Sequence, residues 1–267
     1  MPSQTDTEHL LRRTEFVARG SRVVELLPMS RADAVENILA VDVGAGTPNH
    51  LMVWPGKDKG WDQYVESCNW WVRQMAFMPR PFLEKMVLFW HGHLVSAWWD
   101  VDGGHRLMRQ LQTYRENALG NFVTLAQRMA IDPAMLVYLS NAESRGARLD
   151  WRGTKIYDED PNQNFARELM ELFTLGVGNY TEDAIEAAAA AWTGHNADWN
   201  RDDTQSRIYQ FYPDRHDDRQ KTFFGHRRAW DGPEIIEEIL TGRYSGRSDK
   251  KQIAAKAVLR PKASVCA

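Results

Sequence analysis

The sequence has few cysteines and no long hydrophobic run. Its 267 residues include two cysteines, Cys68 and Cys266, which form neither a CxxC pair nor a zinc knuckle. No stretch of 18 apolar residues is present, so no membrane span is expected. Residues 1–30 are too polar for the hydrophobic region of a signal peptide. We therefore expect a soluble, cytoplasmic protein in a reducing compartment.

Charge of neither sign dominates, and common catalytic motifs are lacking. The formal net charge is -3, which does not favour a nucleic-acid groove or an anionic membrane surface as partner. No GxSxG elbow, P-loop, GxGxxG unit or HExxH helix occurs. Serine or cysteine nucleophiles, nucleotide binding and zincin chemistry therefore have no support in the sequence.

What the sequence does contain is typical of a globular, helical protein. Hydrophobic residues make up 43% of the chain, and eleven tryptophans are present. We expect most of the indoles in the core, with pocket lining as the alternative. The predicted fold class is mainly α, as a multi-helix single domain over residues 1–267.

Helical periodicity and capping residues recur along most of the chain. Thr5, Ser30, Asp160 and Thr181 are predicted N-caps, and Asp231 opens a further helix. The predicted helices lie at about 5–19, 30–41, 61–78, 82–94, 105–118, 120–130, 133–140, 161–175, 182–193, 233–241 and 249–259. Four glycines and two prolines predict a loop over residues 42–60.

Residues 196–225 have a different character. The stretches RIYQFY and KTFFG have the alternating, aromatic pattern of short strands around the polar segment PDRHDDRQ. We expect a small β-hairpin-like excursion near 205–225, or an extended segment there.

Several stretches, in a fixed order over residues 9–259, together point to a known family. They are HLLRRTEF, then FWHGHL with YRENALGNF and DPAMLVYLSNAES, then NQNFARELMELFTLGVGNYTEDAIEAAAAAWTGH, and last HDDRQKTFFG with DGPEIIEEIL. With these motifs the chain resembles the bacterial family called domain of unknown function 1800. The resemblance implies a mainly helical fold, and it brings no reaction with it. Members usually continue with further helices, so we expect this chain to be a truncated or frame-shifted member. Members are also often exported, whereas no export signal is recognised in this sequence.

His91 and His93 are the first candidate metal ligands. Residues two apart on a helix point about 160° away from each other, so these histidines should flank one apolar stripe on opposite sides. A helix break at Gly92 would change this, because glycine lowers helix propensity by about 1 kcal/mol relative to alanine. Either both form interhelix hydrogen bonds, or one of them reaches a metal site.

A polar ridge on the predicted 161–175 helix is the candidate catalytic group. It consists of Asn164, Arg167, Glu168 and Glu171. Two carboxylates at this spacing can bind a metal or act as an acid–base pair. They can equally pair with arginine or cap a neighbouring helix.

His216 and Asp217 are the third candidate, as metal ligands in the β-like excursion that also holds Asp218 and Lys221. A single His-Asp pair is common by chance, and a solvated loop is the alternative. His195, just after Gly194, is expected to interact with the dipole at a helix C-terminus.

Two hypotheses of function remain open. The first is a non-catalytic helical scaffold or partner-binding protein, in which the polar residues form interhelix hydrogen bonds. The second is a metal-dependent, hydrolase-like enzyme that gathers these histidines and carboxylates in one pocket. The second hypothesis brings in a divalent metal as cofactor, and the partner-binding form of the first brings in a protein partner; the sequence identifies neither the metal nor the partner.

Overall fold

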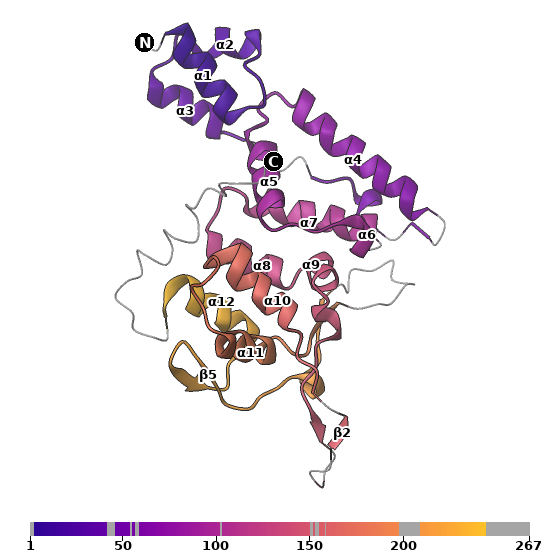
Figure 1. Ribbon diagram of the computed structural model, residues 1–267. Coiled ribbons are helices and arrows are strands. Elements are labelled where there is room, and N and C mark those ends of the chain that lie inside the picture. The colour runs from indigo at the N-terminus through magenta and orange to yellow at the C-terminus, as the bar shows by residue number, and fades with distance from the viewer. Residues whose placement is uncertain are drawn as a thin grey trace. The chain divides into compact units, whose positions relative to one another are not determined.

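The computed structural model describes residues 3–41, 46–53, 55–56, 59–101, 103–149, 152, 155–157, 159–197 and 209–243. These residues are mainly helical, as predicted (Figure 1). They fall into two compact units: Met1–Trp98 with Asp102–Asn121, and Trp99–Val101 with Phe122–Ala267. That the two units act as one domain stays a prediction.

The first unit is built from helices. Its elements are α1 (Gln4–Thr14), α2 (Gly20–Leu26), α3 (Arg31–Leu39), η1 (Asn49–Leu51), α4 (Gly60–Phe77), α5 (Phe82–His93) and α7 (Gly104–Asn117), and α6 (Trp98–Val101) spans the boundary between the units. Ser30 caps α3 as predicted, by accepting a hydrogen bond from the Asp33 amide. The predicted cap of α1 was wrong, because Ser3, two residues before Thr5, forms the capping box with Asp6. The helix also ends at Thr14 and does not continue to Arg19.

Helix α5 continues through Gly92 to His93 without a break. The Glu84 carboxylate of α5 is buried and lies 2.9 Å from Nε of Arg115 in α7. Trp71 of α4 donates its indole N–H to the same carboxylate at 2.9 Å. This buried group therefore links α4, α5 and α7.

The second unit holds the remaining helices. They are α8 (Phe122–Ala130), α9 (Pro133–Tyr138), η2 (Asn141–Glu143), α10 (Gln163–Glu168), the π-helical η3 (Leu169–Thr174), α11 (Glu182–Ala191), η4 (Pro213–Arg215) and α12 (Gly232–Thr241). Thr181 caps α11 and Asp231 caps α12, as predicted. The predicted cap at Asp160 was wrong: Asn162 caps α10, because the backbone of Asp160 instead pairs with Arg145.

The predicted strands exist, but each pairs with a different segment. Strand β4 (Tyr209–Phe211) runs antiparallel to β3 (His195–Ala197), and β5 (Lys221–Phe223) pairs with β6 (His226–Arg228). A further pair joins β1 (Arg148–Leu149) to β2 (Lys155–Tyr157). The small β component is thus confirmed, but the sequence pattern did not reveal β1, β2, β3 or β6.

The core of the second unit surrounds α11, which contacts α10, α12 and β5 (Figure 1). Trp192, at the end of α11, is fully buried, and its ring centroid lies 5.0 Å from that of Phe165. A Cβ atom at Gly232 would lie 2.6 Å from the Trp192 ring, so glycine is required where α12 begins. This packing places the start of α12 beside the end of α11.

Two predictions concern segments at the limits of the described residues. The predicted basic helix at 249–259 lies outside them, as does part of the predicted loop at 42–60. Within the part of the chain that is described, no helix has both the length and the apolar character that crossing a bilayer requires.

Candidate metal centre

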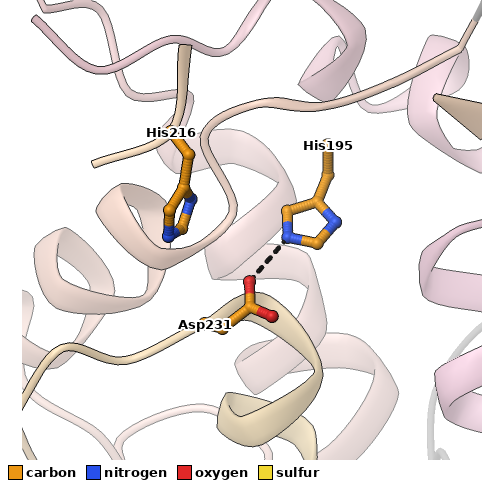
Figure 2. Close-up of side chains that lie close together, drawn as sticks. All are labelled: His195, His216 and Asp231. Atoms are coloured by element: carbon orange, nitrogen blue, oxygen red, sulfur yellow. Dashed lines mark hydrogen bonds and ion pairs between the residues drawn. The ribbon is translucent and has the colours of Figure 1, made fainter. Parts of the chain in front are cut away.

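Three side chains from separate segments of the second unit come together where α11 ends and α12 begins. His195, His216 and Asp231 each offer one ligand atom, and these atoms all lie within 4.8 Å of one another (Figure 2). His195 begins β3, His216 follows η4, and Asp231 is the N-cap of α12. The cluster therefore depends on tertiary packing and has no local sequence motif.

Backbone geometry at Gly194 brings His195 into the cluster. Gly194 has a φ of +80°, and a Cβ atom there would lie 2.6 Å from the Tyr212 carbonyl oxygen. Glycine is thus required both for the conformation and for the close approach of the two chain segments. The His195 ring is buried between Trp192 and Phe211, with centroid distances of 4.7 and 4.9 Å.

His195 forms hydrogen bonds through both ring nitrogens. Its Nε2 lies 2.9 Å from Oδ1 of Asp231, and its Nδ1 lies 2.8 Å from the Tyr209 hydroxyl. Burial raises the pKa of Asp231, but hydrogen bonds from His195 and Gly232 outweigh it, so the pKa falls below its ordinary value. The carboxylate is therefore ionised and accepts a hydrogen bond from the Nε2–H group of His195. Burial, together with the charge of Asp231, raises the pKa of Tyr209 to about 12.

The orientation of His216 leaves one nitrogen available. Its Nδ1 lies 2.9 Å from the Thr193 carbonyl oxygen, which can only accept, so Nδ1 carries the proton. In the neutral ring, Nε2 then has a free lone pair, the form that binds a metal. The Thr193 hydroxyl accepts from the Asp217 amide at 2.8 Å and holds this segment against the end of α11.

Asp217, predicted as a ligand beside His216, forms a separate ion-pair network. Its carboxylate accepts hydrogen bonds from the Arg219 backbone and guanidinium, at 2.6–2.9 Å. Burial raises the pKa of Asp217, but the hydrogen bonds from Arg219 and the charge of Lys221 lower it below its ordinary value. His216 thus belongs to the three-residue cluster, whereas the Asp217 carboxylate forms an ion pair with Arg219.

The first two residues of the predicted ridge on α10, Asn164 and Arg167, form hydrogen bonds with neighbouring helices. Asn164 donates a hydrogen bond to the Leu139 carbonyl oxygen at 3.4 Å. Arg167 forms two hydrogen bonds with the Glu182 carboxylate, at 3.0 and 2.8 Å. These contacts join α10 to α9 and α11, and a catalytic role for either residue stays a prediction.

The two carboxylates of the ridge lie on either side of a change in helix type. Glu168 ends α10, and Glu171 lies in the π-helical η3, where it accepts a hydrogen bond from the Tyr180 hydroxyl. A π-helix has i→i+5 hydrogen bonds, so α-helical spacing does not continue past Glu168. The catalytic role of the two carboxylates stays a prediction.

His91 and His93 lie on α5 of the first unit among aromatic rings. The His91 ring lies 5.2 Å from that of Trp71, and burial lowers the pKa of His91. His93 stacks on Phe89 with a centroid distance of 6.5 Å. Neither His91 nor His93 belongs to the cluster of three candidate ligands that the described residues form.

Sequence reasoning missed Asp231 and Tyr209 as site residues and gave His195 a different role. Asp231 was recognised only as the start of a helix, although its Oδ1 also accepts a hydrogen bond from His195. The strand pattern identified the segment that contains Tyr209, but not its pairing with β3. No sequence motif could link the three candidate ligands, because intervals of 21 and 15 residues separate them.

Comparison with known proteins agrees with the predicted family. No curated protein and no solved structure matches the chain. A family model described as "Protein of unknown function (DUF1800)" matches residues 9–256. Because this match covers most of the 267 residues, the chain belongs to the DUF1800 family.

Proposed function

We propose that the chain binds one divalent transition-metal ion through His195, His216 and Asp231. The carrying observation is that the three ligand atoms lie within 4.8 Å of one another. Around a tetrahedral ion with bonds of about 2.0–2.1 Å, neighbouring ligand atoms are about 3.3 Å apart. Small side-chain movements would therefore close the site around the ion.

The chemistry of the ligands favours a transition metal. Two imidazole nitrogens with one carboxylate oxygen suit zinc or iron(II) better than magnesium or calcium, which prefer oxygen ligands. A histidine that binds a metal through one ring nitrogen usually donates a hydrogen bond from the other nitrogen to a carbonyl, a carboxylate or water. Thr193 supplies this partner to His216, and Tyr209 supplies a hydroxyl to His195.

A hydrolytic enzyme is the function that this ligand set supports best. Three protein ligands leave a fourth position for water, as in catalytic zinc sites, where the metal lowers the pKa of the water to about 7. The Asp231 side chain is 46% exposed, so solvent reaches this edge of the cluster. Within this proposal, His195 and His216 hold the ion and Asp231 partly neutralises its charge.

A helical scaffold is the second candidate, and one observation favours it. The rings of His195 and His216 already form hydrogen bonds within the protein, to Asp231, Tyr209 and Thr193. In this case the cluster would join β3, the η4 segment and α12 without any ion.

Metal titration distinguishes the two candidates. The purified chain is treated with a chelator, dialysed, and titrated with zinc, manganese or iron(II) by calorimetry, with metal content measured afterwards. We expect one equivalent of zinc or iron(II) to bind, and Asp231→Asn to weaken binding at least tenfold. Asparagine retains N-cap function, so α12 should still form in this variant.

Matched variants make the result specific to the cluster. Asp132 caps α9 in the same unit and His226 lies in β6, so Asp132→Asn and His226→Gln should leave metal affinity unchanged. Failure of the wild-type chain to take up stoichiometric metal, or equal affinity in Asp231→Asn, would overturn the proposal and favour the scaffold.

A further inference from the structure

We infer that Tyr209 is a positioning residue for metal uptake, because its hydroxyl lets His195 exchange tautomers when Nε2 leaves Asp231 for the ion. This inference rests on the proposed metal site and deepens it. It is carried by the line of hydrogen bonds from the Tyr209 hydroxyl through both nitrogens of His195 to Oδ1 of Asp231.

The tautomer of His195 in the structure follows from its partners. Asp231 also accepts a hydrogen bond from the Gly232 amide through the same Oδ1. An ionised carboxylate accepts only, so Nε2 of His195 must be the donor to Asp231. A neutral ring then has its lone pair on Nδ1, and the Tyr209 hydroxyl donates to it.

Metal binding through Nε2 requires the opposite tautomer. The proton on Nε2 leaves to solvent, and a proton from solvent enters at Nδ1, so the number of protons on the ring does not change. The Nδ1–H group then needs an acceptor inside the protein, because His195 is 2% exposed. A hydroxyl can donate in the first state and accept in the second, since it has one proton and two lone pairs.

Tyr209 is placed to be that acceptor. The rings of Trp192 and Phe211 pack closely on His195, and neither offers a hydrogen-bond acceptor. The His216 ring lies 6.2 Å away, and in the proposed site its Nε2 lone pair binds the ion. Tyr209 and His195 lie on adjacent strands, β4 and β3, and their rings stack with a centroid distance of 6.0 Å. Backbone pairing therefore holds the hydroxyl at Nδ1 whichever tautomer is present.

Removing only the hydroxyl tests this role. Tyr209→Phe retains the stacked ring, and we expect it to weaken zinc binding about 10–100-fold, the usual effect of losing the partner of a metal-binding histidine. Tyr212→Phe is the matched control, because it removes a hydroxyl three residues along the chain and leaves Tyr209 in place. The control should bind zinc with wild-type affinity.

A spectroscopic readout follows the tautomer itself in the wild-type chain. Nitrogen-15 NMR of labelled histidines should show the His195 proton on Nε2 without metal and on Nδ1 at saturating zinc. An unchanged tautomer on zinc binding, or equal zinc affinity in Tyr209→Phe, would overturn the role of Tyr209 and leave the metal site standing. A wild-type chain that binds no zinc would overturn both.

Discussion

At the scale of single residues, three glycines permit the close contacts on which the candidate site depends. Gly194, Gly146 and Gly232 each lie where an added Cβ atom would come within 3.0 Å of another group. Gly194 lies next to His195, and Gly146 faces the backbone of Asp217. Sequence inspection identified Gly194 only as a helix end, because the atoms that exclude a side chain come from a segment about twenty residues away.

Gly194→Ala should destabilise the second unit more than an alanine at a glycine without close neighbours. At Gly194 the substitution adds strain at positive φ and a contact of 2.6 Å with the Tyr212 carbonyl oxygen. Gly178 has a φ of +79° with nothing within 4 Å of the added atom, so Gly178→Ala measures the backbone strain alone.

Urea unfolding of both variants provides the measurement. We expect Gly178→Ala to lower the free energy of unfolding by about 1 kcal/mol, and Gly194→Ala by about 2–4 kcal/mol. Equal losses in the two variants would mean that the segment around Tyr212 moves aside without cost.

At the scale of elements, the buried pair of Glu84 and Arg115 holds α5 against α7. Burial raises the pKa of Glu84, while the nearby Arg115 and the hydrogen bond from Trp71 act in the opposite direction. Glu84→Ala would leave the buried guanidinium without this carboxylate. We expect a loss of about 3–5 kcal/mol in the free energy of unfolding, the usual result of breaking a buried ion pair.

An exposed glutamate on α7 is the control for this prediction. Glu116 accepts a hydrogen bond from Gln112 at the surface, and Glu116→Ala should change stability by no more than about 0.5 kcal/mol. Chemical denaturation followed by tryptophan fluorescence measures both variants. A loss below 1 kcal/mol in Glu84→Ala would show that the helices pack equally well without the pair.

The longer helices followed from local sequence, whereas several short elements, η3 and β3 among them, did not. Helices α4, α5, α11 and α12 have the predicted positions, because apolar periodicity and capping side chains act within a few residues. The π-helical η3 was not predicted, since its apolar residues fit an α-helical pattern equally well. Strand β3 was missed because three residues after a helix have no strand pattern of their own.

At the scale of the whole molecule, a bound ion should raise the thermal stability of the chain. Zinc that binds only the folded state at 100 times its dissociation constant adds about 2.7 kcal/mol to the free energy of unfolding. For a chain of this size the midpoint should rise by roughly 5–10 °C. Differential scanning calorimetry with and without zinc measures the shift.

The variant Asp231→Asn serves as the control for the thermal shift. Its midpoint should move by less than about 2 °C on addition of zinc, because the carboxylate ligand is gone while the N-cap of α12 is retained. An equal shift in the variant and the wild-type chain would assign the stabilisation to zinc bound elsewhere.

Patterns within the sequence predict the mainly helical fold, the positions of the longer helices and membership of the DUF1800 family. These properties follow from periodicity, capping and motif order, all of which are local along the chain. The meeting of His195, His216 and Asp231 is visible only in the folded chain, as is the hydrogen bond between Tyr209 and His195. The physical reason is that their convergence depends on strand pairing and on close contacts at Gly194 and Gly232, between residues far apart in sequence.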